Sequence, residues 1–337
     1  MSRPWVSVLM STYNGSKYVR EQIESILNQK GVEVQLLIRD DGSNDDTLSI
    51  CGEFEKQHKN VSVYQGENIG VGKSFLELLR MAPVAEYYSF ADQDDFWLED
   101  KLLRAVKMIE ETKGKDLSQD IGEGNPITYD DLLQKDICLD EKMVPVLYGS
   151  NLIRSNERLQ VMGKRFEGIP KCDLFSSITR NVIYGCTMVM NRCLRDLCIV
   201  AGNPTEKVLS RKNHDGWVLY LAYINGVFLY DNESYIRYRE HTNQVVGIKE
   251  LKGTEVLINR IQRLTQAKNK GVRSALAKDL LQKTSDTMKP RIKHHMETLS
   301  DASSIKGTVS LMKDKELIAS FGENKAMIMM RGLLRWI

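Results

Sequence analysis

Residues 90–97 read Phe-Ala-Asp-Gln-Asp-Asp-Phe-Trp, which places three carboxylates within four positions, between aromatic residues. The apolar run over 84–90 predicts a buried strand that ends at the acids. Carboxylates held this close repel one another, so the arrangement favours a site for a divalent cation. A solvated acidic loop is the alternative, and the aromatic residues on both sides argue against it.

Strand and helix patterns alternate in the residues around this cluster. Strands are predicted over 5–10, 32–39 and 61–64, and helices over 17–29, 45–58, 74–81 and 100–111. This alternation predicts an α/β fold, a mostly parallel sheet flanked by helices. Such folds bind ligands at the carboxyl ends of their strands. The polar clusters expected at those ends are 11–14, 40–43, 68–73 and 92–95.

The pattern changes after residue 112. Residues 113–142 are polar and irregular, so we expect an insertion or mobile loop there. Strand patterns return at 144–152, 181–190, 227–230 and 235–238, with a helix over 214–225. We expect one domain over 1–248, built from parts 1–112, 113–142 and 143–248. A basic helical C-terminal extension then follows over 249–337.

Composition narrows the class of protein. Hydrophobic residues make up 42% of the 337 residues, enough for a proper core, and no run of 18 apolar residues predicts a transmembrane helix. The N-terminus lacks a signal-peptide pattern, and six scattered cysteines fit a reducing cytosol. We therefore expect a cytoplasmic protein, and we expect no nucleic-acid partner.

Two phosphate-binding patterns are absent or incomplete. The loop after the first strand reads Ser-Thr-Tyr-Asn-Gly-Ser, without the Gly-x-Gly-x-x-Gly of dinucleotide-binding folds. Gly-Val-Gly-Lys at 70–73 lacks the full spacing of a phosphate loop. A dinucleotide-binding fold and a phosphate loop are therefore weak alternatives.

Four features instead agree on one chemistry. Tyr13 offers a ring for stacking on a nucleobase, and Asp41 could accept the imide proton of uracil or thymine. Asp92 and Asp94 could hold Mg²⁺ or Mn²⁺ against a diphosphate. Asp215, after His214 at the start of a later helix, could act as a base.

With these motifs the chain resembles the inverting family-2 glycosyltransferases of the GT-A fold, over about residues 4–245. The matching motifs are Val-Ser-Val-Leu-Met-Ser-Thr-Tyr-Asn-Gly at 6–15, Ile-Arg-Asp-Asp-Gly-Ser at 38–43, Asn-Ile-Gly at 68–70, Asp-Gln-Asp-Asp-Phe-Trp at 92–97 and Asn-His-Asp-Gly-Trp at 213–217. Tyr-Gly-Cys-Thr-Met at 184–188 and Tyr-Arg-Glu-His-Thr-Asn-Gln-Val-Val-Gly at 238–247 are most similar to bacterial rhamnosyltransferases of capsule or O-antigen synthesis.

The resemblance implies a nucleotide-binding half over 1–112 and an acceptor-binding half over 143–248. Ser11, Tyr13 and Asp41 would bind the base and ribose, with Asn68 and Lys73 near the ribose or diphosphate. The metal would be held by Asp94, the stronger candidate for direct ligation, with Asp92. Arg239 or His241 would complete the diphosphate or metal site, and Asp215 would be the catalytic base.

Each role has a structural alternative. Tyr13 could simply pack at the end of a strand instead of binding the base. Asp40 could exchange roles with Asp41. Lys73 could be a solvated surface residue, and His241 a structural one. Asp95 is expected to support the next helix, and Asp215 could be a helix cap. Cys186 is expected to be a small packed residue.

The predicted reaction moves a sugar from a nucleoside diphosphate to a lipid-linked cell-surface glycan. We favour dTDP-L-rhamnose as donor, with a UDP-hexose or UDP-N-acetylhexosamine as the alternative. A sugar-1-phosphate nucleotidyltransferase is a further rival, but Ser11–Ser16 is not the Gly-rich basic loop that it needs.

The tail differs in charge from the body. Residues 252–337 contain 17 Lys and Arg against 8 Asp and Glu, whereas the whole chain has a net charge of only +2. The last segment, 326–337, has the pattern of an amphipathic helix. Peripheral attachment to the inner face of the cell membrane and packing within the core or a homodimer stay open as alternatives.

Overall fold

The computed structural model describes residues 2–128, 131, 132, 134, 144–241, 270–322, 325–334 and 337. A ten-stranded mixed sheet forms its centre, in the order β3-β2-β1-β4-β9-β7-β10-β5, with β6 paired to β10 and β8 to β7. The strands are β1 (Trp5–Thr12), β2 (Glu33–Asp40), β3 (Val61–Gln65), β4 (Tyr87–Ala91), β5 (Phe96–Trp97), β6 (Pro126–Thr128), β7 (Val146–Ser155), β8 (Val161–Lys164), β9 (Val189–Asn191) and β10 (Val227–Arg239).

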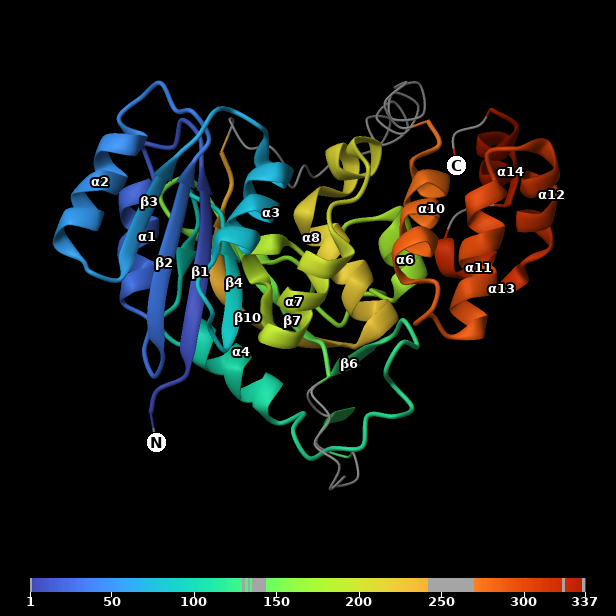
Figure 1. Cartoon of the computed structure of the whole chain (residues 1–337), viewed down its shortest axis with the longest axis horizontal. Helices are drawn as coiled ribbons and strands as arrows, with labels where there is room; N and C mark the ends of the chain where they lie inside the picture. Colours follow the sequence, from blue (N-terminus) through green and yellow to red (C-terminus); the bar gives the residue numbers. More distant parts are fainter. Residues whose placement is uncertain are drawn as a thin grey trace.

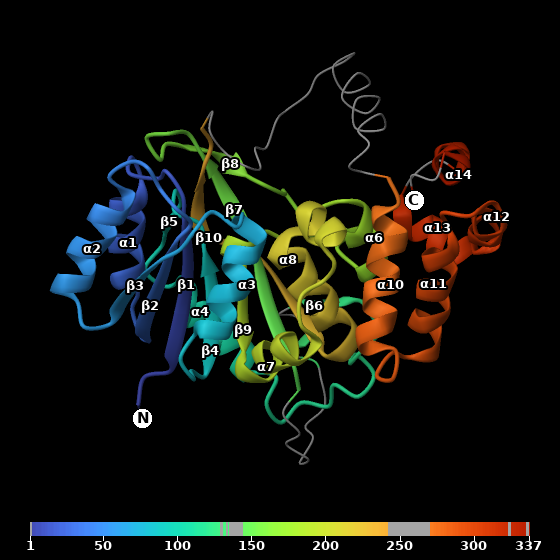
Figure 2. The same cartoon turned by 45° about the horizontal axis from the view of Figure 1, so that its top comes forward.

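Helices cover both faces of this sheet (Figures 1 and 2). One face packs against α1 (Val19–Leu27), α2 (Thr47–Gln57) and α4 (Lys101–Glu110). The other packs against α3 (Val71–Met81), α6 (Leu174–Thr179), α7 (Arg192–Ala201) and α8 (Glu206–Asn225). The first four strands pair in parallel, as the alternating pattern predicts, so their carboxyl ends meet at one edge.

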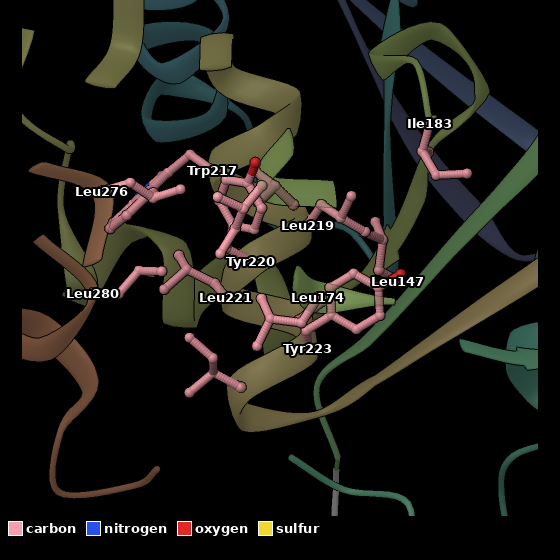
Figure 3. Close-up of a cluster of buried hydrophobic side chains, with 14 of the residues drawn as sticks. Leu147, Leu174, Ile183, Trp217, Leu219, Tyr220, Leu221, Tyr223, Leu276 and Leu280 are labelled. Carbon is pink, nitrogen blue, oxygen red and sulfur yellow. The ribbon is translucent and has the colours of Figure 1, made fainter. Parts of the chain in front are cut away.

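The C-terminal helices extend the second of these layers. They are α10 (Val272–Thr284), α11 (Pro290–Asp301), α12 (Ile305–Lys313), α13 (Lys315–Phe321) and α14 (Lys325–Leu333). Leu276 and Leu280 of α10 pack beside Trp217 and Leu221 of α8 in one hydrophobic cluster, which also contains the buried Ile337 (Figure 3). The described part of this region therefore shares its core with the sheet domain.

The strand expected over 181–190 is wrong for most of its length, and the two strands expected at 227–230 and 235–238 are joined. Residues 181–188 form no strand, because a 3-10 turn over Gly185–Thr187 precedes the short β9. A Cβ on Gly185 would lie 2.7 Å from His214 Nε2, so the glycine permits this close turn. The segments 227–230 and 235–238 are one strand, β10, whose register shifts between Asp231 and Ser234 and between Ser234 and Arg237.

The described part of 113–142 also differs from the expected irregular insertion. It contributes β6 to the sheet and the buried side chains of Leu117, Ile127 and Leu132 to the core. The helical pattern expected at 251–264 lies outside the described residues. Of the helices that are described, none has both the length and the apolar character needed to cross a bilayer.

Candidate active site

A cavity of about 650 Å³ opens at the carboxyl ends of the parallel strands. Loops after β1, β2, β3 and β4 form one side, and the middle of α8, the 3-10 turn and the end of β10 form the other. The predicted residues on its wall are Ser11, Tyr13, Asp41, Asn68, Asp92, Asp94, Asp215 and His241. A second cavity, of about 690 Å³, is lined by Trp5, Glu110 and Asn191 and contains none of the predicted residues.

Tyr13 and Ser11 lie on the part of the wall built by β1 and the loop after it. The Tyr13 side chain is 44% exposed, which leaves its ring free to stack on a flat ligand. Its backbone is fixed by Gln93, whose side-chain amide bonds both the N–H and the carbonyl of Tyr13. Ser11 Oγ lies 2.6 Å from Ser74 Oγ on α3.

Asp40 and Asp41 have different surroundings. Asp40 is fully buried and accepts hydrogen bonds from Thr12 and Ser43, so it supports the loop. Asp41 lines the cavity, and its carboxylate accepts the N–H groups of Ile69 and Gly70 at 3.0 and 2.9 Å. Of the two, only Asp41 lines the cavity.

Arg39, which the sequence analysis did not select, forms an ion pair with Asp41. Its guanidinium also bonds the carbonyl of Glu67 and the side chains of Ser74 and Glu77. A Cβ on Gly66 would collide with this guanidinium, so the glycine leaves room for it. Arg39 thus ties Asp41 to the next loop and to α3.

Two predicted ligand residues do not reach the cavity wall. Lys73 points to Glu206 on α8, with 2.7 Å between Nζ and Oε2. Arg239 is only 3% exposed, and its guanidinium bonds Glu21 and the carbonyls of Asp94 and Glu157. Neither Lys73 nor Arg239 lines the cavity, and each has protein partners, so their expected diphosphate contacts stay a prediction.

The acid cluster divides into two layers. Asp92 and Asp94 line the cavity, and Asp94 Oδ2 lies 2.7 Å from His241 Nε2. Asp95 is fully buried beneath them, where it accepts a hydrogen bond from the Arg239 N–H. This burial agrees with the expectation that Asp95 is not on the ligand side.

Crowding affects the ionisation of these acids. Burial, followed by the charges of Asp94 and Asp215, raises the pKa of Asp92 to about 7. Burial and the neighbouring carboxylates raise the pKa of Asp95 well above its usual value. Ligand atoms of Asp92, Asp95 and Cys186 all lie within 4.8 Å of one another, so the buried Cys186 packs against both acids.

A lysine from α4 lies behind this layer. Lys101 is 1% exposed, with Nζ 3.1 Å from Ser89 Oγ and 3.6 Å from the centre of the Trp97 ring. Burial lowers its pKa to about 7, while the Asp95 charge acts in the opposite direction. The sequence does not indicate that Lys101 is buried, because a lysine in the first turn of an amphipathic helix is usually solvated.

Asp215 lies across the cavity, just after a kink in α8. Asn213 has a φ of 51°, which separates α8 into two helical segments and turns the start of the second toward the cavity. Asp215 accepts the N–H groups of Gly185 and Gly216 at 3.2 and 2.8 Å. Burial raises its pKa to about 6, close to the range in which a general base works.

His214 has a packing role. It is 5% exposed, and its ring lies 4.0 Å from the ring of Phe75 and 4.6 Å from that of Phe90. Neither ring nitrogen has a hydrogen-bond partner among the residues described. Burial lowers the pKa of His214 to about 3, so its imidazole is neutral next to Asp215.

Two tyrosines complete the wall beside Asp215. Tyr184 and Tyr238 both line the cavity, with ring centres 5.6 Å apart. Tyr184 directly precedes Gly185, so the motif at 184–188 was the only available signal for it. Tyr238 follows the alternating pattern of a strand, which gives no reason to separate it from the core.

Comparisons with known proteins identify the family of the chain. The model of the family described as "Glycosyl transferase family 2" matches residues 7–175. The chain is 38% identical over 105 residues to the dTDP-rhamnosyl transferase RfbG of Shigella flexneri, which covers 30% of this chain and 36% of RfbG. It is 30% identical over 154 residues to TuaG of Bacillus subtilis, a glycosyltransferase provisionally assigned to teichuronic acid biosynthesis. That match covers 41% of this chain and 61% of TuaG.

The matched part of the chain thus spans less than two thirds of either relative. In fold, the chain is similar to residues 1–349 of TarS from S. aureus, with a TM-score of 0.53 and 16% identity over 97% of this chain and 80% of that one. The same part of TarS in complex with UDP gives a TM-score of 0.50 and 17% identity over 93% and 76%. With the family model matching half of its residues and the GT-A arrangement of its sheet, the chain belongs to glycosyl transferase family 2.

Proposed function

We propose that this protein is a metal-dependent inverting glycosyltransferase that uses a nucleoside-diphosphate sugar. One observation carries the proposal: Tyr13 and Asp41, the Asp94–His241 pair and Asp215 line a single cavity. Membership of glycosyl transferase family 2 supports this class of reaction. The nucleotide half would be residues 1–112 and the acceptor half residues 143–248.

The nucleotide would bind along the loops after β1, β2 and β3. The exposed ring of Tyr13 would stack on the base, and Asp41 would accept a base N–H. Ser11 and Asn68 would lie near the ribose. Lys73 and Arg239 have no part in this proposal, because each is paired with the protein itself.

The acids beside the nucleotide loops fit Mg²⁺ or Mn²⁺. Carboxylate oxygens are the ligands that both ions prefer, and Asp92 and Asp94 present them at the wall. Burial and the charges of Asp94 and Asp215 raise the pKa of Asp92 to about 7, so a bound cation would stabilise its ionised form. Asp94, Asp92 and His241 would hold the ion, which when bound would neutralise charge on the diphosphate.

The catalytic step would depend on Asp215. Its carboxylate would accept the proton of the acceptor hydroxyl as that oxygen attacks the anomeric carbon from the face opposite the diphosphate. A single displacement of this kind inverts the anomeric configuration. The two backbone N–H groups that bond Asp215 would hold its carboxylate in position for the proton.

Two variants test the assigned roles. Asp94→Ala should weaken Mn²⁺-dependent binding of UDP or dTDP by about tenfold or more, measured by titration calorimetry. Glu99→Gln is the matched control, since Glu99 is exposed and outside the cavity. Asp215→Asn should keep nucleotide binding and lower transfer by about 10²–10⁴-fold. Full transfer by Asp215→Asn would remove Asp215 as the base.

For the donor we propose dTDP-L-rhamnose, with a UDP-sugar as the second candidate. The named activity of RfbG supports the first, and the UDP complex of TarS supports the second. Hydrolysis of dTDP-, UDP- and GDP-sugars by the wild-type protein distinguishes them. We expect dTDP-rhamnose to be hydrolysed at least tenfold faster than any UDP-sugar. If a UDP-sugar is hydrolysed faster instead, the donor is that UDP-sugar.

We further propose that the acceptor is a lipid-linked glycan and that the C-terminal helices contact the membrane that holds it. Met329, Met330 and Leu334 are exposed on one face of the last helical segment, while Ile328 is buried on the other. Lys325 is exposed on the same helix. An apolar face next to basic residues is suited to an anionic bilayer. In both views β1 and β2 lie at the left of the molecule and α14 at the right, and both α14 and the carboxyl ends of β1 and β2 are toward the top (Figures 1 and 2).

Liposome flotation tests this contact with the full chain, since Ile337 is buried in the core and truncation would expose that core. The double variant Met330→Glu, Leu334→Glu should lose flotation with phosphatidylglycerol vesicles. Val200→Glu on α7, at an apolar residue that is even more exposed, should retain it. Unchanged flotation of the double variant would reject the membrane contact. A change in oligomeric mass alone would indicate a homodimer interface instead.

A further inference from the structure

The cavity contains an aromatic surface that the nucleotide and the metal do not use. Tyr184 is partly buried on its wall, with its ring centre 5.6 Å from that of Tyr238 and 5.8 Å from the guanidinium of Arg165. These two neighbours restrict the position of the ring. No group among the described residues bonds the Tyr184 hydroxyl, so both the ring and its hydroxyl are available to a ligand.

This surface adjoins the proposed base directly. The residue after Tyr184 is Gly185, whose N–H bonds Asp215 Oδ2 at 3.2 Å. Gly185 cannot carry a side chain without moving its neighbours, because a Cβ would lie 2.7 Å from His214 Nε2 and 3.3 Å from Asp215 Cβ. The backbone next to Tyr184 is therefore held closely against Asp215.

The position of the surface indicates which substrate it meets. Tyr13, Asp41 and Asn68 line the part of the cavity built by the loops after β1–β3, whereas Tyr184 and Tyr238 belong to the 3-10 turn and the end of β10. A pyranose has one face of C–H groups, which is apolar, and a rim of hydroxyls. A rigid ring beside a carboxylate matches this pattern, since the ring buries the face while the carboxylate meets one hydroxyl.

We propose that Tyr184, supported by Tyr238, is the acceptor subsite and stacks on the apolar face of a pyranose in the acceptor glycan. Stacking brings one ring hydroxyl of that sugar to Asp215. The Tyr184 hydroxyl bonds a second hydroxyl and so contributes to the choice of sugar. This inference rests on the proposed function, because it assigns the substrate that receives the transferred sugar.

The test measures binding of simple sugars separately from binding of the nucleotide. The probes are n-octyl glycosides of glucose, galactose, rhamnose and N-acetylglucosamine, observed by saturation-transfer NMR with the full chain, diamagnetic Mg²⁺ and UDP or dTDP present. Wild type should bind at least one probe through its ring C–H protons. Tyr184→Ala should weaken that binding by about tenfold while nucleotide affinity stays within about twofold of wild type. Tyr184→Phe and Tyr184→Trp should retain most of it, because they keep a ring.

Tyr64→Ala is the matched control, since Tyr64 is 43% exposed on β3 and outside the cavity; it should change neither measurement. If wild type binds nucleotide but none of the four glycosides, or if Tyr184→Ala binds them as wild type does, the subsite is refuted. If Tyr184→Phe and Tyr184→Ala weaken glycoside binding equally, the Tyr184 hydroxyl alone binds the sugar and stacking is refuted. Failure of wild type to bind any nucleoside diphosphate would instead refute the proposed function, and nucleotide affinity also reports whether each variant is folded.

Discussion

The ion pair between Arg39 and Asp41 allows a stability prediction that requires no ligand. Both side chains are nearly inaccessible, at 6% and 3% of their exposed areas. Replacing Arg39 with Met removes the charge that compensates Asp41 and leaves a buried carboxylate. Breaking a buried pair from one side typically costs about 3–5 kcal/mol. Asp41 keeps its two bonds to Ile69 and Gly70, so we expect the lower end, about 3 kcal/mol.

Urea unfolding of four proteins checks this value: wild type, Arg39→Met, Asp41→Asn and the double variant. Asn keeps an acceptor oxygen for one of the two backbone N–H groups and has no charge to compensate. The double variant should therefore lose at least about 1 kcal/mol less than the sum of the single losses. Arg20→Met is the control, because the Arg20–Glu53 pair is 48% exposed on both sides, and it should cost under about 1 kcal/mol. If Arg39→Met costs no more than Arg20→Met, or if the losses simply add, the buried pair does not have the assigned role.

Three further predictions concern the acceptor side and the core. Because burial raises the pKa of Asp215 to about 6 and only the carboxylate accepts a proton, the transfer rate should rise with pH through about 6 and then level off; a flat profile from pH 5 to pH 8 would contradict this. Gly185→Ala should lower stability by about 1–3 kcal/mol in urea unfolding and also reduce transfer, since its Cβ pushes against His214 and Asp215, and normal transfer by this variant would show that their positions are not critical. Trp217→Ala should cost about 3–5 kcal/mol by the same measurement, because Trp217 is fully buried and donates its indole N–H to the Gly202 carbonyl; a loss below about 1 kcal/mol would mean that the core collapses around the gap.

Local patterns were sufficient for the first half of the fold. Each of the strands β1–β3 was predicted within about two residues at either end, because a buried parallel strand is a short apolar run bounded by turn residues. The patterns failed where a segment is shaped by a distant neighbour. Residues 181–188 are apolar enough for a strand but turn closely against α8, and β10 continues through polar residues because Asp231 is buried against Arg104 and Tyr148.

The sequence by itself determined that Tyr13, Asp41, Asp92 and Asp94 share one edge of a sheet, because residues that follow parallel strands must meet there. It could not show which charged residues near that edge face the cavity, since the sequence pattern around a lysine or arginine is the same whether its partner is a ligand or a carboxylate. Only the tertiary structure gave Lys73 and Arg239 protein partners, placed Arg39 behind Asp41 and brought Tyr184 and Tyr238 to Asp215. Each of these contacts joins segments far apart in the chain, and their distance in space depends on how the helices and strands pack rather than on any local pattern.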